Sequence, residues 1–103
     1  MQRVTLVRYA TKPGAASENE KLSRAVFEEL RAKPPKDVAY ALLRQGDEFA
    51  HLFVNMREAD SEAVVGLPTF KAFQKNSGDR FAAEPEIVRF DFNLVDSYGF
   101  ARP

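Results

Sequence analysis

The chain has no cysteine, no tryptophan and a single histidine among its 103 residues. Without cysteine it cannot form a disulfide, a thiolate metal site or a cysteine nucleophile. No apolar run approaches the roughly 18 residues that cross a membrane, and no apolar signal core follows the first methionine. Fifteen basic residues balance fifteen acidic ones, so no net charge attracts nucleic acid or an anionic membrane. We therefore expect a cytoplasmic protein that binds neither.

Motifs for nucleotide binding and for a serine nucleophile are also missing. The chain has no G-x-G-x-x-G, Walker or G-x-S-x-G pattern. A metal site needs converging ligands, and one histidine among scattered carboxylates is weak support for one. We therefore expect no metal and no cofactor. What remains, 45% hydrophobic and 29% charged residues, is the composition of one globular domain over residues 1–103.

The first part of the chain predicts a strand followed by a helix. Arg3–Tyr9 alternates and is rich in β-branched residues, which is typical of a strand. Ser17 followed by Glu20 matches the capping box that begins a helix. Apolar residues then recur at helical spacing, with Glu29 as the one interruption. Two successive prolines end this helix after about Ala32.

Two further alternating segments, 38–45 and 48–56, flank Gly46-Asp47, which is a two-residue hairpin signal. With Gln45 opposite Glu48, the pairing sorts side chains by type, and small aliphatic residues fall on one face. The large aromatic and polar residues fall on the other face: Tyr40, Leu42, Arg44, Phe49, His51 and Phe53. A slip of one residue would mix the two sets, so this register is expected.

The second half of the chain contains two helix signals and one more alternating segment. Residues 60–66 predict a short helical turn. Pro68 suits the first position of a second helix, which Gly78 would close. Residues 86–95 alternate again and predict a fourth strand.

The resulting order, strand-helix-strand-strand-helix-strand, predicts an α+β, ferredoxin-like fold with a four-stranded antiparallel sheet and both helices on one face. Right-handed crossovers place the first and third strands in the centre. We expect the helices to cover the face that carries the small aliphatic residues, among them Val4, Leu6, Ala39, Ala41, Leu43, Leu52 and Val88. The aromatic face would then stay open.

An open aromatic face would be too large to remain in water. Its four big aromatic side chains present roughly 600 Å², more than a soluble monomer shows in one patch: Tyr9, Tyr40, Phe49 and Phe53. We therefore expect a homodimer through the open sheet face. Polar residues on this face would be costly to bury dry, so the two sheets should enclose a partly wet cavity: Arg44, His51, Arg89, Asp91 and Asn93.

The chain resembles the dimeric α+β barrel superfamily, which includes the antibiotic-biosynthesis monooxygenase-like proteins. The element order carries this resemblance, together with the strand Val4–Tyr9 running into Lys12–Gly14 and the segment Leu67–Phe73. The resemblance implies a homodimer whose sheets form a barrel, with a pocket between sheet and helices. It also implies an activity among those of the group, which holds cofactor-free oxygenases of polycyclic phenols, haem-degrading enzymes, lactone isomerases and proteins of no known activity.

His51 and Asp91 are the candidate catalytic residues. His51 is the only side chain whose usual pKa is close to neutrality, although a sheet histidine that is hydrogen-bonded at the dimer interface is the alternative interpretation. Asp91 could act beside Arg89 and Asn93, or form a structural ion pair. We expect about 9–10 Å between His51 and Asp91, two strand spacings, which a small ring could bridge.

Two functions follow from these residues. The first is a small, cofactor-independent enzyme, monooxygenase-like, that acts on an aromatic or apolar small molecule. The second is a non-catalytic dimeric binding or accessory module with the same cavity. In either case the substrate-binding residues are expected to be Tyr9, Tyr40, Arg44, Phe49, Phe53, Arg89 and Asn93.

Overall fold

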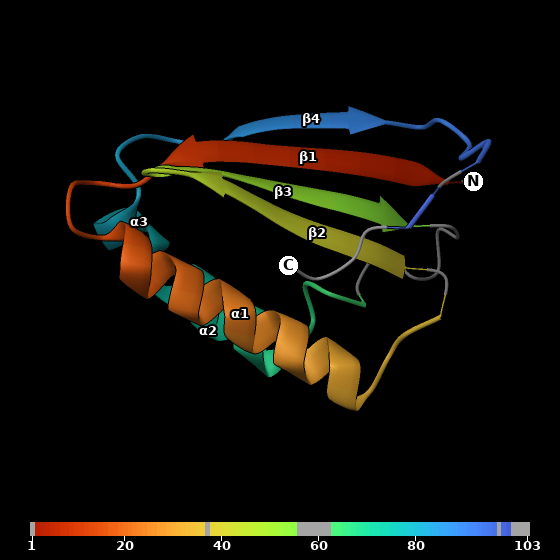
Figure 1. The fold of residues 1–103 in the computed structure, drawn as a ribbon, viewed down its shortest axis with the longest axis horizontal. Helices are drawn as coiled ribbons and strands as arrows, with labels where there is room; N and C mark the ends of the chain where they lie inside the picture. Colours follow the sequence, from red (N-terminus) through yellow and green to blue (C-terminus); the bar gives the residue numbers. More distant parts are fainter. Residues whose placement is uncertain (1, 37, 56–62, 97, 100–103) are drawn as a thin grey trace.

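Four antiparallel strands form one sheet in the order β2-β3-β1-β4, and the helices lie over one of its faces (Figure 1). The structure is a computed structural model that describes residues 2–36, 38–55, 63–96 and 98–99. The predicted fold class and the central position of the first and third strands are confirmed. The elements are β1 (Arg3–Ala10), α1 (Ala16–Ala32), β2 (Val38–Gln45), β3 (Glu48–Asn55), α2 (Pro68–Lys75), α3 (Ser77–Arg80) and β4 (Glu86–Phe90).

The hairpin between β2 and β3 has the predicted register. Gln45 is opposite Glu48, and each later pair follows in step to Val38 opposite Asn55. The turn uses Gly46 at φ +60°, a left-handed conformation that glycine adopts without a steric penalty. The two-residue loop therefore sets which side chains of both strands share a face.

Helix α1 begins earlier than its capping-box signal indicates. Its N-cap is Ala15, with no side-chain hydrogen bond, so Ser17 lies inside the first turn and does not cap it. The Ala15 amide donates to the Lys12 carbonyl at 3.0 Å, so the turn before the helix already directs the chain into it. The predicted end at Ala32 is confirmed.

Helix α2 begins at Pro68, as predicted, but Gly78 does not close it. The helix ends at Lys75, with Asn76 as a non-helical C-cap, and Gly78 lies inside the short helix α3. Of the helical turn expected over 60–66, residues 60–62 lie outside the described residues, and 63–66 form a turn without helix.

Strand β4 is shorter than the alternation predicts, ending at Phe90 where residues up to 95 were expected. Phe90 pairs with Val4, one residue from the start of β1. Beyond Phe90 only Arg3 of β1 remains opposite the chain, so almost no ladder of hydrogen bonds is left to extend. Asp91 and Asn93 therefore lie outside the strand.

The helices cover the aromatic face of the sheet, and the opposite prediction was wrong. Phe49 is 1% exposed and His51 is 3% exposed, and Tyr9 and Phe53 are also buried. The sorting of side chains onto two faces was correct. The choice of face was not, because the large rings find matching rings such as Phe70 on α2, and burying them removes more apolar surface from water.

The sheet face without helices is aliphatic. Two rows of apolar residues cross all four strands on this face: Ala41, Leu52, Leu6 and Val88, then Ala39, Val54, Val4 and Phe90. Leu43 and Phe90 are 55% and 37% exposed. Within the described part of the chain, no helix is long and apolar enough to cross a membrane.

Candidate functional site

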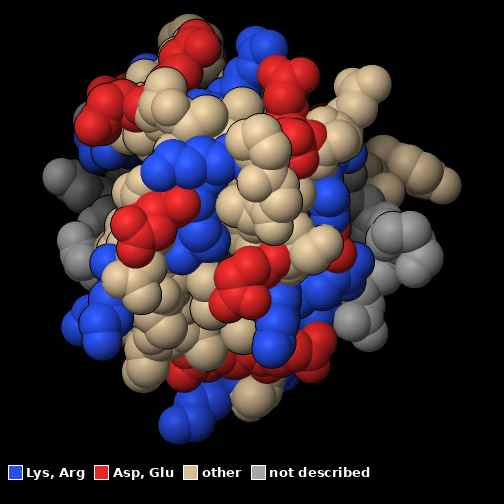
Figure 2. Space-filling model, turned by 90° about the vertical axis from the view of Figure 1, so that its left-hand side faces the viewer, with Lys and Arg blue, Asp and Glu red and all other residues tan. Residues whose placement is uncertain are grey.

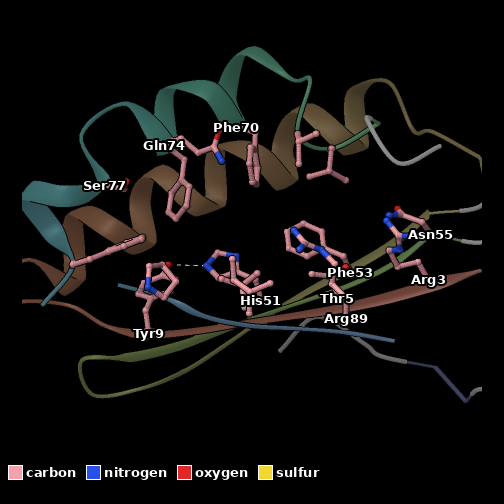
Figure 3. Close-up of a pocket in the computed structure, with 17 residues that line it drawn as sticks. Arg3, Thr5, Tyr9, His51, Phe53, Asn55, Phe70, Gln74, Ser77 and Arg89 are labelled. Carbon is pink, nitrogen blue, oxygen red and sulfur yellow. Dashed lines mark hydrogen bonds between the residues drawn. The ribbon is translucent and has the colours of Figure 1, made fainter. Parts of the chain in front are cut away.

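A cavity of about 460 Å³ lies between the helix-facing side of the sheet and the α2 region (Figure 3). Its floor is made by alternate residues of β1, β3 and β4, because successive side chains along a strand point to opposite faces. The middle of the cavity is apolar, with Val7 and Phe53 from the sheet and Phe70 and Phe73 from α2.

The two halves of the cavity carry different polar groups. Tyr9 and His51 lie toward one end, beneath Gln74 of α2 (Figure 3). Toward the other end lie two guanidinium groups, with a hydroxyl and an amide beside them: Arg3, Arg89, Thr5 and Asn55. An apolar cavity with a few converging polar groups is the usual form of a small-molecule site.

A chain of hydrogen bonds runs through the buried end of the cavity. The Arg80 Nε donates to the Asn19 Oδ1 at 3.0 Å, and the Asn19 Nδ2 donates to the Tyr9 hydroxyl at 2.8 Å. The Tyr9 hydroxyl lies 2.7 Å from the His51 Nε2, and the Tyr40 hydroxyl lies 2.5 Å from the His51 Nδ1. One imidazole therefore links two phenols.

The direction of each hydrogen bond follows from Arg80. A guanidinium only donates, so Asn19 must present its oxygen to Arg80 and its NH₂ group to Tyr9. With its oxygen accepting from Asn19, the Tyr9 phenol directs its own proton to the His51 Nε2. The pattern therefore favours a neutral imidazole with its proton on Nδ1, where it donates to Tyr40.

Burial sets the protonation states of these groups. Desolvation lowers the pKa of His51 to about 4, so the imidazole is neutral near pH 7. Desolvation also raises the pKa of Tyr9 to about 12, against an opposing effect of the Asn19 hydrogen bond and the Arg80 charge. Burial raises the pKa of Tyr40 as well, with a smaller contribution from Tyr9. At neutral pH the network holds three uncharged groups.

Arg80 is held in place by the backbone around it. Its carbonyl accepts from the Lys12 amide at 2.7 Å, and the Ala82 amide donates to the Ala10 carbonyl at 2.9 Å. These bonds fasten α3 to the end of β1, next to Tyr9. The guanidinium also donates to the Phe73 carbonyl and lies 5.0 Å from the centre of the Phe73 ring.

Solved structures share this fold over nearly the whole chain. Rv0793 from Mycobacterium tuberculosis matches with a TM-score of 0.75 at 16% identity, over 96% of this chain and all of its own, 100%. An antibiotic biosynthesis monooxygenase-like protein from Caulobacter crescentus matches with a TM-score of 0.76 at 21% identity, over 90% of this chain and 91% of its own. NE2512 from Nitrosomonas europaea, a protein of unknown function, matches with a TM-score of 0.73 at 18% identity, over 98% of this chain and 96% of its own.

The chain has the fold of the antibiotic biosynthesis monooxygenase-like proteins. No protein-family model matches it, and no curated protein matches it in sequence. In this monooxygenase-like fold the cavity lies between sheet and helices, where the resemblance of the sequence implied a pocket.

Four of the predicted site residues line the cavity: Tyr9, His51, Phe53 and Arg89. Tyr40 reaches the same site through its bond to the His51 Nδ1. Phe49 is buried against Tyr9, with ring centres 5.6 Å apart, and is not among the lining residues. His51 lies beneath the helices and not on the uncovered sheet face, where the interface interpretation would have placed it.

Three predicted residues lie away from the cavity. Arg44 is exposed and pairs with Glu20 of α1 at 2.9 Å. Asp91 pairs with Arg3 at 3.0 Å, with both side chains half exposed. Asn93 is exposed in the segment after β4. The structure therefore does not bring Asp91 and His51 together, and Asp91 pairs with Arg3, which lines the cavity.

Asn19, Ser23 and Arg80 are buried polar residues that the sequence reasoning missed. Asn19 and Ser23 are four residues apart, which places them on one face of α1 with Val26, and all three are buried. That spacing was a usable signal, since polar residues on an apolar helix face need buried partners. No comparable signal in the sequence pointed to Arg80.

Metal ligands do not converge in the described part of the chain, where no group of three or more His, Asp or Glu residues could hold an ion. The imidazole nitrogens of His51 both face phenol oxygens. The chemistry that this site offers is therefore proton transfer between oxygen and nitrogen, next to an apolar space.

Proposed function

We propose that the chain binds an aromatic or apolar small molecule in the cavity beneath α2 and oxygenates it without a cofactor. The observation that carries this proposal is the Tyr9–His51–Tyr40 network at the end of an aromatic cavity. Tyr9 and His51 both line the cavity, so a hydroxyl of a bound ligand has a phenol and an imidazole within reach.

The proposed role of the network is to take a proton from the ligand. A ligand hydroxyl next to Tyr9 gives its proton to the phenol oxygen, while Tyr9 passes its own proton to the His51 Nε2. Burial makes the His51 imidazole a weak base while the cavity holds no ligand. Once the ligand has lost its proton, its negative charge stabilises the imidazolium that forms. Such general base catalysis typically contributes about 10²–10⁴-fold to a rate.

Oxygenation then needs only an electron-rich substrate and dioxygen. A CH₂ group conjugated to the new phenolate loses two hydrogens and gains one oxygen atom, and the other oxygen atom leaves as water. The balance is R₂CH₂ + O₂ → R₂C=O + H₂O, in which the substrate is oxidised and dioxygen is reduced. The protein supplies orientation, exclusion of water and the first proton transfer.

The test is enzyme-dependent oxidation of 1,8-dihydroxyanthrone, a polycyclic phenol with one CH₂ group, followed by oxygen uptake. We expect Tyr9→Phe and His51→Gln to lower the rate by about 10²–10⁴-fold. Arg24→Gln, on the exposed side of α1, is the matched control and should keep the full rate. A rate that is the same with and without the protein would refute the oxygenase proposal.

A non-catalytic binding module is the second candidate, and one observation favours it. His51 is 3% exposed, with both nitrogens already hydrogen-bonded, which is what a purely structural histidine needs. In that case His51→Gln lowers the melting temperature, and ligand binding falls only as far as stability does. Binding of the anthrone without oxygen uptake would support this module over the enzyme.

A further inference from the structure

The cavity lining has a positive formal charge. Two of the residues that line it are arginines, and no aspartate or glutamate is among the described lining residues. The chain as a whole, by contrast, has a formal net charge of zero. On the face at the end with the β2–β3 turn, basic and acidic side chains are interspersed (Figure 2).

The two arginines differ in what they already contact. Arg3 is paired with Asp91 at 3.0 Å, which offsets much of its charge. Arg89 has no ion pair with any described residue. It is opposite Thr5 in the sheet, and both residues line the cavity. A guanidinium with unused donors beside an apolar cavity is suited to a carboxylate, which it can bind through two parallel hydrogen bonds.

The distance between the two polar regions sets the length of the ligand. Thr5 and Tyr9 are four residues apart on β1, so their Cα atoms are about 13 Å apart along the strand. The space between them is lined by Val7 of β1 and by Phe70 and Phe73 of α2. Allowing for the side chains at both ends, this separation suits a fused two-ring aromatic acid.

We propose that the cavity binds an aromatic carboxylate, with its acid group at Arg89, its rings between the sheet and α2, and its far end against Tyr9. This rests on the proposed function only in using the same cavity as the ligand site. It adds the charge and the orientation of the ligand. A neutral ligand of the same shape would leave the Arg89 donors to water and gain only the apolar contacts.

The experiment is calorimetric titration with 2-naphthoate and with its uncharged counterpart, 2-naphthamide. We expect naphthoate to bind at least about tenfold more tightly than the amide, the size expected when a charged hydrogen bond is made at a partly open site. Arg89→Gln should weaken the binding of naphthoate by about tenfold and leave the affinity for the amide unchanged. Arg89→Lys, which keeps the charge, should lose less, and Arg24→Gln should match the original chain.

The orientation is tested with 6-hydroxy-2-naphthoate, which carries a hydroxyl at the end opposite its acid group. We expect the hydroxyl to improve binding over naphthoate by about threefold to tenfold, the contribution of one hydrogen bond. Tyr9→Phe should remove this gain while Arg89→Gln preserves it. If Arg89→Gln removes the gain and Tyr9→Phe does not, the orientation is overturned.

The outcomes separate this inference from the proposed function. Equal binding of naphthoate and naphthamide, with no effect of Arg89→Gln, would overturn the anion preference while leaving the cavity as a ligand site. If neither probe binds at millimolar concentration, the shared ligand site itself fails, and this inference with it. A melting temperature measured for each variant identifies any loss of binding that comes from unfolding.

Discussion

His51 stands out at the residue scale because its ionisation is linked to folding. The buried imidazole has a pKa of about 4, whereas an exposed histidine in the unfolded chain has a pKa near 6.5. Between about pH 4 and pH 6.5, His51 is protonated in the unfolded chain and neutral in the folded chain. Lowering the pH through this range therefore favours unfolding, and stability is fully present only above about pH 6.5.

The first prediction is a loss of stability on mild acidification. Between pH 7.5 and 5.5 the free energy of unfolding should fall by about 1 kcal/mol through His51, since carboxylates titrate mainly below this window. Urea unfolding at the two pH values measures it. His51→Gln should lose this part of the pH dependence. An imidazole NMR signal that titrates with a midpoint above pH 6 would contradict the assignment.

The second prediction concerns Arg80, which donates to two buried acceptors, the Asn19 Oδ1 and the Phe73 carbonyl. Arg80→Met keeps the apolar bulk and leaves both acceptors unpaired, so it should cost about 2–4 kcal/mol. Chemical unfolding measures this loss. Arg31→Met is the matched control, because Arg31 also lies over a ring, that of Phe27 at 5.9 Å, but is exposed. A loss of equal size in both variants would contradict the role given to Arg80.

At the scale of elements, Glu29 joins the two main helices. Its Oε1 accepts from the Thr69 amide at 3.1 Å and from the Thr69 hydroxyl at 2.6 Å. Thr69 is the second residue of α2, where backbone amides lack partners inside the helix. The one interruption in the apolar stripe of α1 is therefore a cap for another helix, supplied across the helix–helix contact.

The third prediction follows from this cap. Hydrogen bonds from Thr69 lower the pKa of Glu29, so the cap stabilises the fold above the usual glutamate pKa and is lost as the pH falls below it. Glu29→Gln should lower the melting temperature at pH 7. It should also make the decrease in melting temperature from pH 7 to pH 4 smaller than in the original chain. Glu28→Gln, which changes an exposed i,i+3 pair with Arg31, should have a smaller effect. Thermal unfolding of the three proteins at pH 7 and 4 decides between them.

Elements defined by local chemistry were predictable from the sequence. The Gly46-Asp47 turn and the alternation on both sides of it specified the register of the hairpin, and Pro68 specified the start of α2. The length of β4 was not predictable in this way, because it depends on where β1 begins. Which face of the sheet the helices cover was not predictable either, because it depends on the aromatic rings that α2 packs against that face.

The site was only partly predictable for a similar reason. Tyr9, His51, Phe53 and Arg89 share one sheet face, and alternation alone assigned them to it. Asn19 and Arg80 come from two helices, and their contacts with Tyr9 and with each other exist only after those helices dock. Long-range contacts of this kind have no local pattern in the chain.

At the scale of the whole molecule, the aliphatic sheet face is the face that the described helices leave uncovered (Figure 1). We propose that a second copy of the chain covers it, through a twofold contact between the two sheets. Two apolar rows cross its four strands, with Leu43 and Phe90 exposed, and a second apolar sheet would remove these side chains from water. Phe92, which is also exposed, stacks on Phe90 with ring centres 5.1 Å apart and extends the face.

The fourth prediction tests this dimer with the same charge on opposite faces of β3. Light scattering after gel filtration at micromolar concentration should give twice the 11.6 kDa chain mass. Leu52→Glu, on the aliphatic face, should give a folded monomer. Phe49→Glu, which places the charge beneath the helices at a 1% exposed position, should unfold the chain. A Leu52→Glu protein that keeps the dimer mass would exclude this face as the contact.

The position of the cavity on the helix-covered side of the sheet determines how such a dimer would bind ligand. The cavity is lined from the helix-covered side of the sheet, and the proposed aliphatic contact would lie on the other side. Two copies would then carry two separate sites, facing away from each other, and neither copy would close the entrance of the other. Ligand would enter each site independently, so saturation would be hyperbolic, with one molecule per chain and no communication between the pair.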